Sequence, residues 1–92
     1  MMFMFPELSK TETEVVACID NNESLYLFVT DRAEELCASC GCTYTERMRT
    51  VERLARDLRE SVLPEIAGPF AYSVRSDLVA EHFLAVASKD LE

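Results

Sequence analysis

The sequence predicts an α+β domain in which a small antiparallel sheet packs against two or three helices. The sheet is indicated by residues 13–20 and 24–30, two runs rich in β-branched, aromatic and aliphatic residues, as strands are. The helices are indicated most clearly by residues 43–63, where apolar side chains recur with the helical period. At 92 residues, the chain has room for a single domain, residues 1–92.

The two expected strands are separated by Asn21, Asn22 and Glu23. Asparagine tolerates positive φ and is common in turns, so the pattern indicates an N-terminal hairpin. A third strand is expected over residues 70–75, because large side chains alternate there with small or polar ones. The opening MMFMF is a candidate edge strand.

A helix is expected to begin at Asp31, because Asp31 and Glu34 resemble a capping box. Its apolar positions are in phase with those of the helix expected over residues 43–63, so the two could form one continuous helix. One rod over residues 31–63 would be about 50 Å long at 1.5 Å per residue, whereas a compact domain of this size has a radius of gyration of about 12 Å. We therefore expect a break near Gly41.

The next helix begins at a second capping box, formed by Thr43 and Glu46, and is expected to end at Pro64. Its apolar stripe lies within about 40° of one line on the helical wheel. The stripe consists of Tyr44, Met48, Val51, Ala55, Leu58 and Val62. A last helix is expected to be capped by Ser76 or Asp77 and to run to about Ser88.

The net charge of −8 argues against a general nucleic-acid binder and against binding to anionic membranes. It suits a partner with a basic protein surface, although acidity can also serve solubility alone. The opening MMFMF is shorter than the roughly 7–15 apolar residues of a secretory signal, and no apolar run approaches the ~20 residues of a membrane span. We expect a cytoplasmic protein with reduced thiols.

The four cysteines are Cys18, Cys37, Cys40 and Cys42. A structural zinc site usually takes two separated pairs of ligands, and only the Cys37–Cys40 spacing resembles one pair. Those two residues also share the apolar face of the expected helix, where thiols pack as small hydrophobes. We predict core cysteines and no metal, with a metal or redox role as the alternative.

Nothing in the sequence indicates catalysis or a cofactor. The motifs G-x-S-x-G, G-x-G-x-x-G and H-E-x-x-H are absent, as is a phosphate-binding loop. His82 stands beside Phe83 with no motif linking it to a nucleophile, and we expect it to be a half-buried surface histidine. The protein is predicted not to be an enzyme.

Five arginines within thirteen residues are the candidate partner-binding residues. They are Arg49, Arg53, Arg56, Arg47 and Arg59. Residues 47–59 hold five positive and two negative charges, a local +3, whereas the rest of the chain holds four positive and fifteen negative, or −11. On the wheel, Arg49, Arg53 and Arg56 lie within about 60° of one another and opposite the apolar stripe. Guanidinium forks suit phosphate or carboxylate.

A simpler interpretation of this face is a solvated helix surface. Pairs such as Glu52–Arg56 and Arg53–Asp57 would then neutralise it, each contributing about 0.2–0.5 kcal/mol.

Small size, segregated charge and the lack of a catalytic motif favour a protein that acts by binding a macromolecular partner. In these respects the chain resembles small acidic phage-encoded inhibitors of the anti-CRISPR type, in general character only. The resemblance implies an inhibitor of a CRISPR–Cas surveillance complex, with Cas proteins and guide RNA as partners. The alternatives are a homodimeric regulatory or antitoxin-like protein and a small zinc-binding module.

Overall fold

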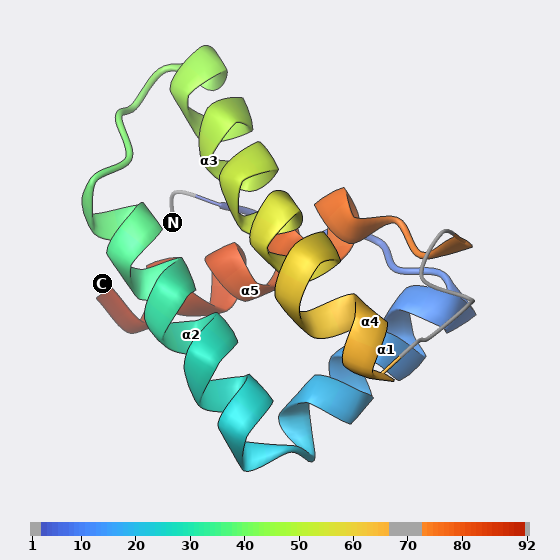
Figure 1. The fold of residues 1–92 in the computed structure, drawn as a ribbon. Helices are drawn as coiled ribbons and strands as arrows, with labels where there is room; N and C mark the ends of the chain where they lie inside the picture. The colour runs from blue at the N-terminus through green and yellow to red at the C-terminus, as the bar shows by residue number, and fades with distance from the viewer. Residues whose placement is uncertain (1–2, 67–72, 92) are drawn as a thin grey trace.

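The computed structural model describes residues 3–66 and 73–91, and every regular element within them is a helix. In chain order these are α1 (Lys10–Asp20), α2 (Glu23–Ala38), α3 (Tyr44–Asp57), the π-helical turn η1 (Leu58–Val62), α4 (Leu63–Ile66) and α5 (Ser76–Leu91). Figure 1 shows α5 behind α2 and α3, and it packs most extensively against these two helices. The α+β prediction is therefore wrong, because the described chain is a small all-α bundle.

The first predicted strand, residues 13–20, lies in α1. Its buried side chains recur every third or fourth residue, as on one face of a helix; they are Glu12, Val15, Val16 and Ile19. The β-branched composition suggested a strand, but propensity is a weak preference that burial of an apolar face overrides. Ser9 begins the helix, because its side chain accepts the backbone N–H of Glu12 at 3.5 Å.

The second predicted strand, residues 24–30, lies in α2, which begins at Glu23 rather than at Asp31. The side chain of Asn22 caps α2 by accepting the N–H of Leu25 at 3.2 Å. The Asn21 amide ends α1 by donating to the carbonyl of Ala17 at 2.9 Å. The predicted hairpin turn is therefore a corner between two helices.

Glu12 is a buried carboxylate that ties α1 to the segment before α5. Its carboxylate accepts the hydroxyl of Ser9 at 2.5 Å and the backbone N–H of Arg75 at 3.4 Å. The hydrogen bond from Ser9 is the main reason that the pKa of Glu12 is lowered, against the opposing effect of burial. A charged residue is thus accepted in the core because hydrogen bonds satisfy it.

The predicted break near Gly41 and the capping box that follows are both confirmed. Thr43 accepts the N–H of Glu46, and the Glu46 carboxylate accepts the N–H of Thr43. A Cβ atom at Gly41 would overlap the Glu46 carboxylate. Glycine therefore gives the capping carboxylate its space.

Pro64 does not end the helix, contrary to expectation. The chain continues through η1 and α4 to Ile66. Proline has no N–H, and its ring clashes with the carbonyl four residues earlier in a regular α-helix. The turn before it is widened, so that the N–H of Leu63 donates to the carbonyl of Leu58, five residues earlier. This wider turn accommodates Pro64 within a continuing helix.

The remaining predicted strands are not supported in the described residues. Residues 70–72 lie outside them, and residues 73–75 form no strand before α5 begins at Ser76, one of the two residues that the sequence predicts as its cap. Residues 3–5 of the opening MMFMF also form no strand. Phe3 is buried instead, and its N–H donates to the Ser88 hydroxyl of α5 at 3.5 Å.

The predicted apolar stripe of α3 and η1 is only partly in the core. Its C-terminal four members are buried, whereas Tyr44 is 72% exposed and Met48 is 42% exposed. Figure 1 shows the first turns of α3 projecting past the other helices. The helical period placed all six residues on one side, but only the position of α5 decides how far that side is covered.

Candidate functional site

Three arginines line the side of α3 that faces away from the core. Arg49, Arg53 and Arg56 are exposed, while Val51, Leu54 and Ala55 of the same helix are buried. The three are separated by four and three residues, so the row extends about 10 Å along the helix at 1.5 Å per residue. Arg49, Arg53 and Arg56 are called the arginine face below.

The acidic residues of α3 do not neutralise the arginine face. Neither expected pair, Glu52–Arg56 or Arg53–Asp57, forms a salt bridge. Glu52 accepts from Arg59 at 2.9 Å, and Asp57 accepts from the Nε of Arg32 at 2.7 Å. In the part of the chain that the structure describes, no ion pair involves any residue of the arginine face. The local positive charge is thus left open to solvent.

The partner of Asp57 comes from α2, and the pair is half-buried between the two helices. The hydrogen bond to Asp57 is the main reason that the pKa of Arg32 is raised. Sequence spacing cannot reveal this pair, because its members are 25 positions apart. The tertiary contact engages the carboxylate that would otherwise be available to Arg53.

Arg47 and Arg59, the other two predicted binding residues, lie apart from the arginine face. Arg59 joins η1 to α5 through a hydrogen bond to the Ser76 hydroxyl at 3.0 Å, in addition to its bond with Glu52. Arg47 is half-buried beside a hollow of about 280 Å³. The lining of that hollow comprises Phe3, Met4, Tyr44, Arg47, Met48, Val51 and Glu81. We therefore assign neither residue to the site.

A polar hollow of about 150 Å³ lies beside the arginine face. It is lined by Ser39, Cys40, Gly41, Glu46, Arg49, Thr50 and Arg53. Two positively charged residues, Arg49 and Arg53, and one negatively charged residue, Glu46, line it. The Glu46 carboxylate already accepts the N–H of Thr43 at the N-terminus of α3. A water molecule takes about 30 Å³ in the liquid, so the hollow has room for a group the size of a phosphate. Its chemistry suits an oxyanion.

The cysteines divide by burial. Cys37 is buried, as predicted, and its thiol donates to the carbonyl of Leu84 at 3.5 Å. Burial raises its pKa to about 11, which disfavours the thiolate. Cys40 is half-buried and accepts from the Thr50 hydroxyl at 3.2 Å, whereas Cys18 and Cys42 are exposed. Among the described residues, no three His, Cys, Asp or Glu side chains are grouped to hold a metal ion.

Thiol labelling should reproduce this division. At pH 8 in native protein, Cys18 and Cys42 are expected to react fastest with a water-soluble disulfide reagent and Cys40 more slowly. Cys37 should react only on unfolding, because it is buried and its pKa is raised. Peptide mapping of protein quenched at successive times identifies each site. Equal rates at Cys37 and Cys42 would contradict the burial of Cys37.

His82 lies against the aromatic rings of Phe5 and Phe83. It is half-buried on α5, as the sequence predicts, and its ring packs edge-on against Phe5 with centroids 5.4 Å apart. Burial lowers its pKa, while the negative charge of Asp20 acts in the opposite direction. The structure thus gives His82 a packing role beside Phe5.

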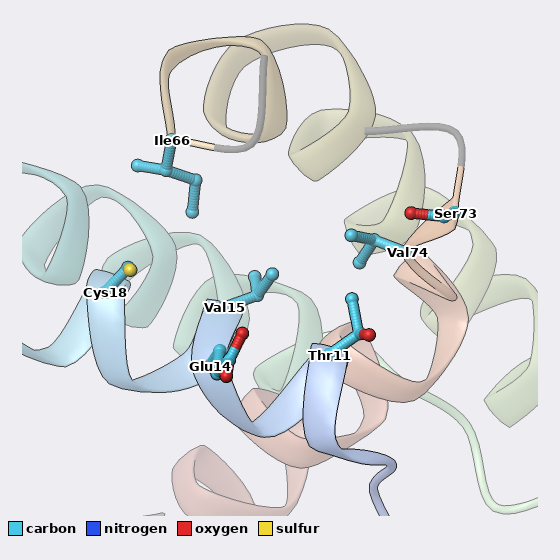
Figure 2. A pocket seen from close by; sticks show the side chains of 7 residues that line it. All are labelled: Thr11, Glu14, Val15, Cys18, Ile66, Ser73 and Val74. Atoms are coloured by element: carbon cyan, nitrogen blue, oxygen red, sulfur yellow. The ribbon is translucent and has the colours of Figure 1, made fainter. Parts of the chain in front are cut away.

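The larger hollow drawn in Figure 2 measures about 340 Å³ and lies between α1, the end of α4 and the segment before α5. Thr11, Glu14, Val15 and Cys18 line it from α1. The labelled lining offers one carboxylate, one thiol and two hydroxyl groups, with no Lys, Arg or His among its residues. Its chemistry is less distinctive than that of the arginine face.

A scan against protein-family models and searches of curated proteins and solved structures each found no match. Within the described residues, no helix combines the length and the apolar character that crossing a bilayer requires. The candidate site therefore rests on its own geometry and charge.

Proposed function

We propose that the protein is a non-catalytic binding protein whose arginine face contacts phosphate groups of a ribonucleoprotein partner. The ion pairs of the α3 carboxylates support this most directly. Glu52 and Asp57 are engaged by Arg59 and Arg32, and the three exposed guanidinium groups of the arginine face have no ion pair within the described residues. Each guanidinium presents a fork that matches phosphate oxygens.

The net charge favours a ribonucleoprotein over free nucleic acid. A chain of charge −8 repels a free polyanion at long range, whereas the basic surface of an RNA-binding protein attracts it. The acidic surface would then meet protein, and the arginine face would meet RNA phosphates. Inhibition of a CRISPR–Cas surveillance complex is the specific form of this proposal, with Cas protein and guide RNA in those two roles.

The experiment is capture on immobilised protein from lysate of cells that carry a CRISPR–Cas system. The surveillance complex should be retained, and ribonuclease treatment should reduce its retention. With three phosphate contacts, the logarithm of the affinity should fall with the logarithm of salt concentration with a slope of about −2, since each phosphate on a single strand contributes about 0.7. Expression in the same cells should restore plaquing of a targeted phage.

The outcomes separate the parts of the proposal. Capture that is insensitive to both ribonuclease and salt would exclude the phosphate contact. Unchanged plaquing, with capture of a different ribonucleoprotein, would exclude the CRISPR-specific form and leave the phosphate contact in place.

The homodimeric alternative would use the exposed apolar residues Met4, Tyr44 and Met48 around the 280 Å³ hollow. If the protein is a homodimer of this kind, its sedimentation coefficient should rise with protein concentration. No grouping of ligands in the described residues favours the zinc-binding alternative.

A further inference from the structure

The N-terminal half of α2 exposes three consecutive large apolar side chains. Tyr26, Leu27 and Phe28 are 40%, 49% and 45% exposed. Leu25 and Val29 on either side of them are buried in the core. Residues 25–29, about one and a half turns at 3.6 residues per turn, are therefore apolar around the whole helix, a pattern typical of a helix covered on all sides. In the isolated chain, the fold covers one side only.

Acidic residues extend this exposed surface along the helix. Glu23, Asp31 and Glu34 lie four residues before, four after and seven after Leu27 respectively, so they share its side of α2. All three are exposed, and none forms an ion pair within the described residues. Arg32, the basic residue of α2, is held by Asp57 and Glu35. The carboxylates are thus available to a partner.

This surface, the α2 face, is defined by Glu23, Tyr26, Leu27, Phe28, Asp31 and Glu34. It spans twelve residues, about 18 Å or three helical turns at 1.5 Å per residue. Its centre is apolar and its ends are acidic. It shares no residue with the arginine face.

We infer that the α2 face docks a basic amphipathic helix of a protein partner. An apolar stripe on such a helix would cover Leu27, and Tyr26 and Phe28 would flank it at about 100° on either side. Its lysine or arginine side chains would pair with the carboxylates of Glu23, Asp31 and Glu34. Helix-on-helix recognition of this kind uses apolar anchors at helical spacing, and charge at the rim sets the choice of partner.

Charge argues against the other occupants of the α2 face. A second copy of the same face would bring three carboxylates against three, which is repulsive. The arginine face of a second copy supplies positive charge but lies opposite the apolar stripe of α3, so it offers no apolar side chains to the centre. An anionic membrane would be repelled. The inference does not rest on the proposed function, because it concerns a different surface and a different chemistry.

The test uses a fluorescein-labelled synthetic helix of eighteen residues, with leucines on one side and lysines on the other. Binding to the full chain is followed by fluorescence anisotropy. The Leu27→Ser and Phe28→Ser double variant keeps the net charge at −8, so bulk attraction to the cationic peptide is unchanged. Its affinity should nevertheless fall about tenfold or more, since two apolar anchors are lost.

The matched control is Tyr44→Ser with Met48→Ser, which also replaces two exposed apolar side chains without changing the charge. Its affinity should stay within about twofold of wild type. A peptide of the same composition with the leucines scrambled out of helical phase should bind as weakly as the wild-type peptide binds the Leu27 and Phe28 variant.

A second pair of variants, which changes charged residues, tests the inference even if the Leu27 and Phe28 variant does not fold. Glu23→Lys with Asp31→Lys should weaken binding more than Glu7→Lys with Glu65→Lys, because both change the net charge by +4 and only the first lies on the α2 face. Equal losses in either matched comparison would overturn the inference. Sedimentation showing that the Leu27 and Phe28 variant disrupts a wild-type dimer would also overturn it, since a second copy would then be the occupant.

Discussion

Reversal of the arginine face to glutamate, as Arg49→Glu, Arg53→Glu and Arg56→Glu in one chain, should abolish binding of the proposed ribonucleoprotein partner. The three side chains are exposed, and none makes an ion pair within the described residues. Each surface change should alter the free energy of unfolding by no more than about 0.5 kcal/mol. Where a contact is bidentate and desolvated, each single change should cost about 1–3 kcal/mol of binding free energy.

Net charge has to be controlled in this experiment, because three reversals also make the acidic protein still more negative. Arg49→Glu with Arg53→Glu can be compared with Lys10→Glu and Lys89→Glu, since each double variant has a net charge of −12 in place of −8. The lysines are exposed on α1 and α5, away from the arginine face. The first variant should lose binding and the second should retain most of it. Circular dichroism checks that both are folded.

A folded triple variant that keeps wild-type affinity would reduce the arginine face to a solvated helix surface. Equal losses in the two double variants would instead assign the effect to long-range charge.

Phe83→Ala should destabilise the fold by about 3–5 kcal/mol. Phe83 is 2% exposed on α5, the helix against which α2 and α3 both pack. Its truncation removes buried apolar surface and leaves a cavity in a core that is small to begin with. A chain of this length has a total stability of about 5–14 kcal/mol, so the variant should be close to unfolded at 37 °C.

The control for this prediction is Phe28→Ala, which removes the same atoms from a side chain that is 45% exposed. Its free energy of unfolding should fall by less than about 1 kcal/mol. Urea denaturation followed by circular dichroism at 222 nm measures both variants. Similar midpoints for the two would contradict the placement of Phe83 at the centre of the bundle.

The second half of the chain was predicted more accurately than the first half. Thr43 and Glu46 carry a capping signal that is local in sequence, and α3 begins where that signal predicts. Local signals misled the prediction at Asp31, where a similar pattern falls inside α2. A capping residue acts only if the chain before it is not already helical, and the preceding residues 23–30 are helical.

The misread hairpin has a related cause. Residues 25–29 are apolar on every side, so their periodicity cannot distinguish a helix from a buried strand. The spacing of Leu25, Val29, Ala33 and Leu36 becomes a clear helical signal only when the window extends past residue 30. In α1, one of the buried positions that recur with the helical period is Glu12. A carboxylate is not expected in a core from the sequence, and its burial depends on hydrogen bonds from Ser9 and Arg75.

In the candidate site, some features follow from the sequence and others from the tertiary structure. The sequence by itself determined that five arginines are concentrated in residues 47–59 and that three of them lie opposite an apolar stripe, because a helix converts spacing into direction. Only the tertiary structure decided which arginines remain available. Arg32 reaches Asp57 from another helix, and Arg59 turns to Glu52 and Ser76. Ion pairs depend on distances in space, and packing alone sets those distances between residues far apart in the chain.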